Sequence, residues 1–336
     1  MSRAAQRDIQ PRSGLAGLRE RLGDEGFAFG LRIILILGIG VFLSASTQGQ
    51  SFLSTANILN VLRQASLIFL LASGLTLVIL AGGFDLSVAS NLTLSACLAA
   101  GVMKATGSPL LGAAVALGCS TFAGLCNGMA VTLLRLPPFL ATYGTLWILQ
   151  GLAFHYMGGN EIFGFPPAFR LLGTGFVLGI PVPVYLMALV LALGTVVTRH
   201  LNIGQEIYAI GANPVAARLS GIPVRRRQLA VYTASGLMAG VAALVYLARV
   251  NSADSGIGEP LLLPAIAAIL IGGTSLFGGV GSVLGTVAGS VILALVINGM
   301  NLLNVKSTWQ PLVVGVVLLV AVLADLLSRG RRERIG

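Results

Sequence analysis

Charged side chains are scarce in this 336-residue sequence, because Asp, Glu, Lys and Arg together make up only 10% of it. A water-soluble domain carries charge on about a quarter of its residues. Hydrophobic residues amount to 56% and the mean hydropathy is +0.92, so there is too little polar surface to cover a soluble globule. These values exclude a soluble fold and indicate a polytopic helical membrane protein.

Lysine and cysteine are also rare, and neither is arranged for catalysis. Lys104 and Lys306, the two lysines, lie outside the pattern of Gly, four residues, Gly, Lys and a hydroxyl residue that forms a P-loop. Any ATP must therefore be handled by another polypeptide. The three cysteines fall inside apolar runs without metal-ligand spacing, which is typical of small packing residues. We expect no catalytic residue, cofactor or metal site in this chain, and hence no enzyme.

Acidic groups within the predicted spans are few as well. Ion-coupled carriers usually place acids or His in mid-membrane, where these groups bind a proton or an ion. Here Asp85 and Asp325 lie at the ends of predicted spans. The predicted spans therefore offer few groups that could bind a coupling ion, and we keep an ion-coupled secondary transporter of a small polar solute only as the alternative interpretation. Since a permanently charged solute would meet complementary groups, this scarcity favours a small, neutral, polar solute.

Long apolar runs are what the sequence has in abundance. A helix needs about 20 apolar residues to cross the hydrocarbon layer of a membrane. Ten candidate spans lie at 31–47, 60–81, 87–103, 109–133, 138–156, 181–198, 228–248, 261–276, 283–303 and 309–327. We therefore expect an all-α, polytopic membrane protein with about ten transmembrane helices.

Arginine dominates the basic residues and predicts the orientation. With the amino terminus in the cytoplasm, sixteen basic residues lie inside and five outside, which follows the positive-inside rule. Membrane topology thus explains the net charge of +10, and we expect no nucleic acid partner. The chain divides into a cytoplasmic basic tail (1–30), a transmembrane domain (31–328) with its largest inside connection at 199–227, and a second cytoplasmic basic tail (329–336).

The inside connection contains signals for a short, isolated helix. Asn213 is a preferred N-cap, Pro214 suits the first helical position, and Gly221 permits a left-handed residue after the end. They bracket a helix at 214–220, and two turns alone are marginal in water. The helix either lies on the lipid surface, assisted by nearby arginines, or enters a groove on a cytoplasmic partner and transmits motion to the spans.

Four blocks of this sequence carry a family resemblance. They are GQEIYAIGANPVAARLSGI at 204–222, GGFDLSV at 82–88, LPPF with AT at 136–142, and IGGTSLFGG with GS at 271–282. Over residues 50 to 328 the chain closely resembles the permease subunits of bacterial ABC importers for ribose and related monosaccharides. Two positions depart from the pattern: Val215 stands where such permeases often have a charged residue, and Ala89 where they often have Gly.

The resemblance implies a fold, a location and partners. It implies a type II ABC importer permease in the bacterial inner membrane, which forms half of a transmembrane dimer with an identical or related permease. A cytoplasmic ABC ATPase would hold ATP and Mg²⁺, a periplasmic solute-binding protein would deliver the solute, and 199–227 would be the cytoplasmic coupling loop. The ATPase-coupling residues would be Asn213, Pro214, Val215, Ala216, Ala217, Arg218, Leu219, Ser220, Gly221 and Ile222.

Polar and aromatic stripes within the spans are candidates for a translocation path. An unpaired amide costs several kcal/mol in hydrocarbon, so amides in spans should face protein or water. Aromatic rings and amides can also contact the apolar faces and hydroxyl rims of a sugar. The candidates are Asn57, Asn60 and Gln64 on the second span, Asn91 on the third, and Tyr143, Trp147, Gln150 and Phe154 on the fifth. Packing and lipid contact are the competing interpretation for the aromatic stripe.

Two glycine-containing turns fall on the same predicted side of the membrane. In the first, Gly83, Asp85 and Ser87 precede the third span, and we expect the Asp85 carboxylate to cap that helix by accepting from backbone amides. In the second, Gly273, Thr274 and Ser275 follow the eighth span. Both are either tight inner turns or gates made from broken helices.

Glycines also recur at helical spacing within two spans. Gly236 and Gly240 share a face of the seventh span, and Gly281, Gly285 and Gly289 share a face of the ninth. Such spacing lets helix backbones approach closely in lipid. We therefore expect these faces to pack against neighbouring helices.

Overall fold

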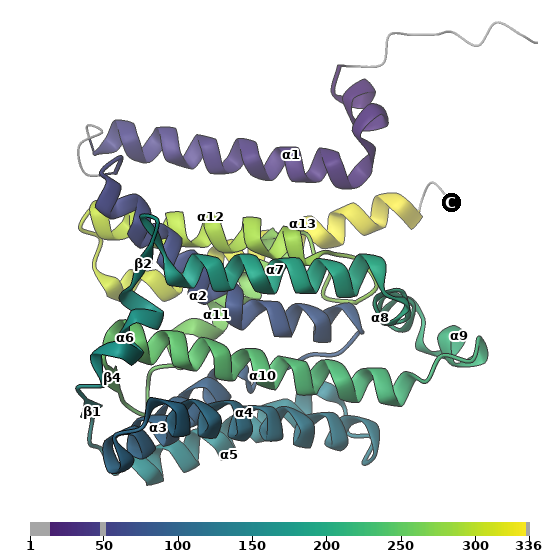
Figure 1. The fold of residues 1–336 in the computed structure, drawn as a ribbon. Coiled ribbons are helices and arrows are strands. Elements are labelled where there is room, and N and C mark those ends of the chain that lie inside the picture. The colour runs from purple at the N-terminus through teal and green to yellow at the C-terminus, as the bar shows by residue number, and fades with distance from the viewer. Residues whose placement is uncertain (1–13, 48–51, 334–336) are drawn as a thin grey trace, which may run out of the picture.

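The computed structural model describes residues 14–47 and 52–333 and shows long helices lying side by side along one direction (Figure 1). Within these residues, each of the ten predicted spans falls on one helix. These helices are α1 (Gly14–Ser46), α2 (Thr55–Leu80), α3 (Val88–Thr106), α4 (Pro109–Thr132), α5 (Pro138–Met157), α7 (Val182–His200), α10 (Val224–Val250), α11 (Glu259–Ile271), α12 (Val283–Leu302) and α13 (Gln310–Glu333). Residues 1–13 and 334–336 of the predicted tails lie outside the described residues.

Not every helix has the length and apolarity of a membrane span. Seven of the helices in the described residues do, namely α2, α3, α4, α7, α10, α12 and residues 29–46 of α1. α11 has only 13 residues, whereas a crossing takes about 20. The eighth predicted span is therefore too long, because α11 ends at Ile271, ahead of two glycines. The structure supports a multi-pass membrane protein and does not confirm the count of ten spans.

Several helices begin after a serine that caps the first turn, and two helices are followed by a glycine that suits a helix end. The hydroxyls of Ser54, Ser108 and Ser282 each accept a hydrogen bond from a first-turn amide of α2, α4 and α12, which satisfies one donor that has no partner within the helix. Gly82 after α2 and Gly273 after α11 have φ of 73° and 78°. This left-handed conformation is accessible to glycine at no steric cost.

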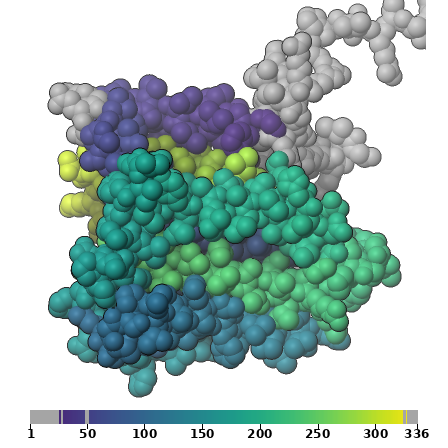
Figure 2. Space-filling model, viewed as in Figure 1, coloured from purple at the N-terminus to yellow at the C-terminus, as the bar shows by residue number. Residues whose placement is uncertain are grey.

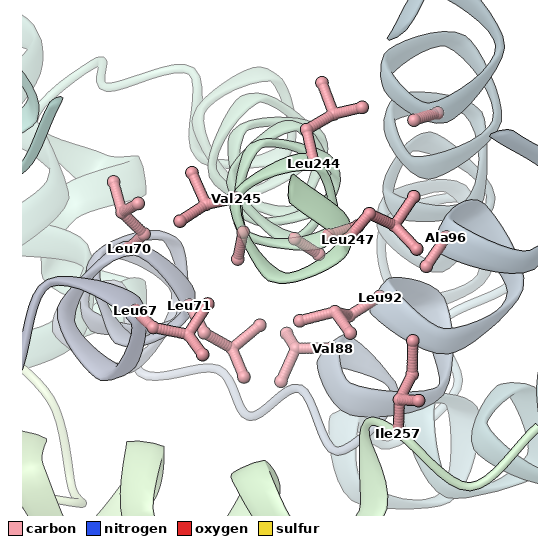
Figure 3. Packing of buried hydrophobic residues seen from close by; sticks show 14 of the residues in the cluster. Leu67, Leu70, Leu71, Val88, Leu92, Ala96, Leu244, Val245, Leu247 and Ile257 are labelled. Atoms are coloured by element: carbon pink, nitrogen blue, oxygen red, sulfur yellow. The ribbon is translucent and has the colours of Figure 1, made fainter. Parts of the chain in front are cut away.

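The core lies where α2, α3 and α10 meet. Figure 3 shows side chains of these helices facing one another, among them Leu70, Leu71, Val88, Leu92 and Leu247. All five are essentially inaccessible to solvent. Truncating one such leucine to alanine costs about 2–5 kcal/mol, because the surrounding helices close the cavity only in part.

Small residues allow the closest helix contacts, as predicted for the glycine stripes. A Cβ added to Gly236 of α10 would lie 2.3 Å from the Ser120 carbonyl oxygen of α4. A Cβ added to Gly289 of α12 would lie 1.9 Å from the Ala268 carbonyl oxygen of α11. Gly281 was wrongly included in the α12 stripe, because it lies in the turn ahead of that helix and has a φ of 143°.

The two largest connections lie at opposite ends of the bundle (Figure 1). At one end, β1 (Ile162–Phe163) pairs antiparallel with β4 (Ser252–Ala253), β2 (Phe176–Val177) pairs with β3 (Ile180–Pro181), and α6 (Pro167–Thr174) packs on α10. At the other end are α8 (Asn202–Ala212), α9 (Pro214–Leu219) and the last turns of α13. The predicted outside and inside connections are thus separated by the length of the helices.

α1 packs along the edge of the bundle and exposes apolar side chains. It contacts α12, and the space-filling view shows it as a ridge along one border of the molecule (Figure 2). Leu31, Ile34, Leu37, Val41 and Phe42 are exposed on it. A surface of this kind suits lipid, which is as apolar as these side chains.

Candidate functional site

The short helix α9 has both of the caps that the sequence predicts. The Asn213 side-chain oxygen accepts hydrogen bonds from the backbone amides of Val215 and Ala216, each at 3.0 Å. The helix ends at Leu219, with Ser220 as its C-cap, one residue earlier than expected. Gly221 follows with a φ of 84°. These two caps hold a helix that would otherwise be marginal at this length.

α9 has one face against the protein and one face exposed. Ala217 is buried and packs with Ile210 of α8 and Val224 of α10. Val215 and Leu219, four residues apart, are 67% and 85% exposed, so they lie on a common outward face. Of the ten predicted coupling residues, Ala217 is buried and is not available to a partner, Ile222 is partly buried, and the other eight are exposed. The exposed set includes the outward apolar pair Val215 and Leu219.

The helices on either side of α9 are joined to each other. Glu206 of α8 forms an ion pair with Arg227 of α10. The Tyr208 hydroxyl of α8 donates to the Gly281 carbonyl oxygen at 2.8 Å. The sequence analysis predicted neither this hydrogen bond nor this ion pair, because the two residues of each pair are more than 20 positions apart in the chain. α9 is thus flanked by segments that are bonded to other parts of the bundle.

The first glycine-containing turn, residues 81–87, surrounds a buried carboxylate. Asp85 is 1% exposed, and its carboxylate accepts from the Ser87 amide at 3.0 Å, the Ser87 hydroxyl at 2.7 Å, the Ser235 hydroxyl at 3.1 Å and the Asn127 side-chain nitrogen at 3.5 Å. The expectation that Asp85 caps the third span is wrong in its geometry. The single backbone amide it binds belongs to Ser87, which precedes α3. Its other partners are the Ser87 hydroxyl and the side chains of Asn127 on α4 and Ser235 on α10.

The position of Asp85 also differs from the predicted span end. Ser235 is the twelfth residue of α10, which places it about 16 Å along the helix axis from the start. The turn 81–87 therefore folds back into the bundle. The sequence analysis missed two partners of Asp85, namely Asn127 and Ser235. In the sequence they are polar residues inside apolar runs, and this pattern does not indicate which residues they contact.

The second glycine-containing turn, residues 272–282, has the same hydrogen-bond pattern as the first. The amides of Gly82 and Gly83 donate to carbonyl oxygens three and five residues earlier, and the amides of Gly273 and Thr274 do the same. This is the Schellman arrangement of helix ends. The Ser275 amide donates to the Val280 carbonyl oxygen at 2.9 Å and closes the turn. Both features are therefore tight turns at the end of a helix, and whether they also act as gates stays a prediction.

The two turns meet at the end of the bundle that carries α9. The Gly279 amide donates to the Leu80 carbonyl oxygen at 3.0 Å. Gly211, at the end of α8, is packed against both of these residues. The structure thus brings together three segments that the sequence analysis treated separately, namely residues 81–87, residues 272–282 and the end of α8, just ahead of α9.

The predicted path residues on α2 and α3 are mostly engaged in internal hydrogen bonds. Asn57 exchanges two amide hydrogen bonds with Asn298 of α12, at 3.1 and 2.7 Å. The Asn60 side-chain oxygen accepts from Arg249 at 3.0 Å. Asn91 is buried and donates to the Ser120 carbonyl oxygen at 3.0 Å. Asn57 and Asn91 therefore connect helices to one another. Gln64, the remaining α2 candidate, is partly buried.

The aromatic stripe on α5 is exposed. Tyr143, Trp147 and Phe154 each expose a large part of their surface, and the first two rings contact edge to face with centroids 6.3 Å apart. Gln150 donates to the Ser255 carbonyl oxygen at 2.6 Å. α5 packs against α3 and α4, whereas the start of α2 packs against α12.

The described part of the chain offers no metal centre. No group of three or more His, Cys, Asp or Glu residues is arranged to hold a metal ion within residues 14–47 and 52–333. The three cysteines are free thiols in helices α3 and α4. What the arrangement provides is a capped helix, α9, set among helix ends that contact one another.

Comparisons with known proteins find one matching family and several similar proteins. Residues 57–322 match the family described as "Branched-chain amino acid transport system / permease component". The ribose import permease protein RbsC of Bacillus subtilis (strain 168) is 40% identical over 94% of this chain and 96% of that protein. The D-allose transport system permease protein AlsC of Escherichia coli (strain K12) is 36% identical over 87% and 90%, and the xylose transport system permease protein XylH of the same organism is 32% identical over 89% and 92%.

No solved structure matches the chain. The family match nevertheless contains both glycine-containing turns, the coupling segment and all predicted path residues. It covers far more than half of the chain, and relatives above 30% identity align along nearly their whole length. This multi-pass membrane protein therefore belongs to the family of branched-chain amino acid transport system permease components.

Proposed function

We propose that the chain is the permease subunit of an ATP-driven importer for a monosaccharide. The observation that carries the proposal is the outward apolar pair Val215 and Leu219, presented by a helix that is capped at both ends. A fixed apolar pair at the i and i+4 positions of a short helix suits insertion into a groove on a partner protein. The partner we propose is a cytoplasmic ABC ATPase, which binds the ATP and Mg²⁺.

The proposed cycle uses the chain as a mechanical element. Closure of the ATPase displaces α9, and the helices joined to it change their packing, so that the path opens alternately to the two sides. A second permease copy or a related permease completes the transmembrane unit, and a periplasmic solute-binding protein delivers the solute. In this arrangement ten spans cross the bacterial inner membrane with both termini in the cytoplasm, as the distribution of arginine indicates.

The solute class rests on the relatives and on the scarcity of charge. The relatives are named for ribose, D-allose and xylose transport, all of which are neutral polyhydroxy compounds. Tyr143, Trp147 and Phe154 are exposed aromatic rings in the described residues, and they are our candidates for contact with a sugar face. Asn57 and Asn91 are less suited to this role, because their amides already bind other helices.

The docking role is tested by a matched pair of leucine substitutions. Leu219→Asp places a charge on the outward face of α9, whereas Leu178→Asp does so at a residue that is 94% exposed at the opposite end. We expect Leu219→Asp to insert normally but to lose co-purification with the ATPase, and Leu178→Asp to retain it. Equal retention of the ATPase by both variants would contradict the docking role.

The alternative of an ion-coupled carrier rests on the buried carboxylate of Asp85. Buried acids in membrane domains often bind a proton or an ion. Here, however, the carboxylate already accepts four hydrogen bonds. Reconstitution in proteoliposomes separates the two functions. The proposed importer takes up solute only with the ATPase, ATP and binding protein present, whereas an ion-coupled carrier accumulates it unaided and stops when an ionophore is added.

A further inference from the structure

The end of α8 is packed against both glycine-containing turns with no space between their backbones. A Cβ added to Gly211 would lie 1.9 Å from the Leu80 carbonyl oxygen and 2.4 Å from the Gly279 amide nitrogen. A Cβ added to Gly278 would lie 2.8 Å from the Cα of Gly82 and 3.0 Å from that of Gly211. We call the contact among Gly82, Gly211, Gly278 and Gly279 the glycine junction.

Hydrogen bonds hold the three segments of the glycine junction together. The Gly279 amide donates to the Leu80 carbonyl oxygen at 3.0 Å, and the Tyr208 hydroxyl donates to the Gly281 carbonyl oxygen at 2.8 Å. The first bond joins the two turns, and the second joins α8 to the second turn. The three segments therefore cannot separate without breaking hydrogen bonds in a region of close backbone packing.

The glycine junction lies between the coupling helix and the Asp85 network. Gly211 is two residues ahead of Asn213, the N-cap of α9. On its other side, the turn 81–87 continues to Asp85, whose carboxylate binds Asn127 of α4 and Ser235 of α10. A displacement of α9 thus has a direct contact route to α2, α3 and α4, none of which is adjacent to α9 in the chain.

We propose that Gly211 is a positioning residue that transmits the movement of α9 across the glycine junction to the turns 81–87 and 272–282. The inference rests on the proposed function, since it requires an ATPase to move α9. Its physical basis is that only glycine leaves room for the three backbones to touch, and touching backbones move together. A side chain at this position would separate the turns from α8 while leaving the outward face of α9 unchanged.

The test is Gly211→Ala, with Gly118→Ala as its matched control. Gly118 lies in α4, and a Cβ added there meets no atom within 4 Å. Permease, ATPase and binding protein are reconstituted, and ATPase co-purification, ATP hydrolysis and sugar taken up per ATP hydrolysed are measured. We expect Gly211→Ala to retain the ATPase and to hydrolyse ATP, but to lose about tenfold in sugar per ATP, within the range reported for residues on coupling routes. Gly118→Ala should match the unchanged protein.

A second variant keeps the test decisive if Gly211→Ala fails to insert. Tyr208→Phe removes the hydroxyl that binds Gly281 and adds no volume, and we expect it to lower sugar per ATP by about threefold, as loss of one hydrogen bond along such a route implies. A normal ratio of sugar to ATP in every variant that inserts, or loss of the ATPase from such a variant, would overturn the proposal. Failure of the proposed function is distinct, because there Leu219→Asp retains the ATPase or the unchanged protein transports without it.

Discussion

Replacing Gly236 with alanine tests how closely α4 and α10 pack. The added Cβ would lie 2.3 Å from the Ser120 carbonyl oxygen and 2.9 Å from the Cα of Gly124, so the helices must separate by about 1 Å to restore ordinary contact. Overpacking of this kind costs about 1–3 kcal/mol. The Ser120 carbonyl oxygen also accepts from Asn91, and weakening that hydrogen bond adds about 1 kcal/mol.

The summed cost of about 2–4 kcal/mol corresponds to a decrease in melting temperature of roughly 3–6 °C for a chain of this length. The assay is thermal unfolding of the purified protein in detergent, followed by fluorescence and by the monodisperse fraction that remains after heating. Gly118→Ala, in α4 but facing open space, is the control and should not lower the melting temperature. Equal melting temperatures for both variants would refute the reasoning that direct backbone contact holds α4 against α10.

Two further predictions address the topology and the paired amides. In a variant without native cysteines, Leu178→Cys is expected to react with an impermeant maleimide in intact spheroplasts, and Leu219→Cys only in inverted vesicles; labelling of both from one side would contradict the separation of the two ends. Asn57→Ala should destabilise the protein by about 1–3 kcal/mol, because it leaves the buried Asn298 amide without its partner. Asn298→Ala should cost less, because the Asn57 amide is only partly buried and still donates to the Phe52 carbonyl oxygen. The double variant should cost less than the sum of the two, measured as a double-mutant cycle of melting temperatures, and simple additivity would argue against the reciprocal pair.

The short helix α9 was predictable because its signals are local. Asn213 and Pro214 specify the start and Gly221 the end through interactions that span no more than five residues. The structure shortens the helix by one residue, since Ser220 is its C-cap. The inward position of Ala217 was not predictable in the same way, because it depends on Ile210 and Val224 of the flanking helices.

The polar residues within the spans show where sequence reasoning stops. An amide in an apolar run predicts that the side chain has a polar partner, and this holds for Asn57 and Asn91. The identity of the partner decides between a path and a structural contact. Asn298, the partner of Asn57, lies 241 residues away, so the spacing of residues within one helix contains no information about it.

By itself, the sequence determined the membrane character of the chain, the approximate positions of its long helices and the capped helix between α8 and α10, since hydropathy and capping act over one element at a time. The tertiary structure alone decided that Gly82, Gly211 and Gly279 meet and that Asp85 binds Ser235 in the interior. These contacts join segments of the chain separated by 60 residues or more. They arise from how the helices pack, which no local pattern specifies.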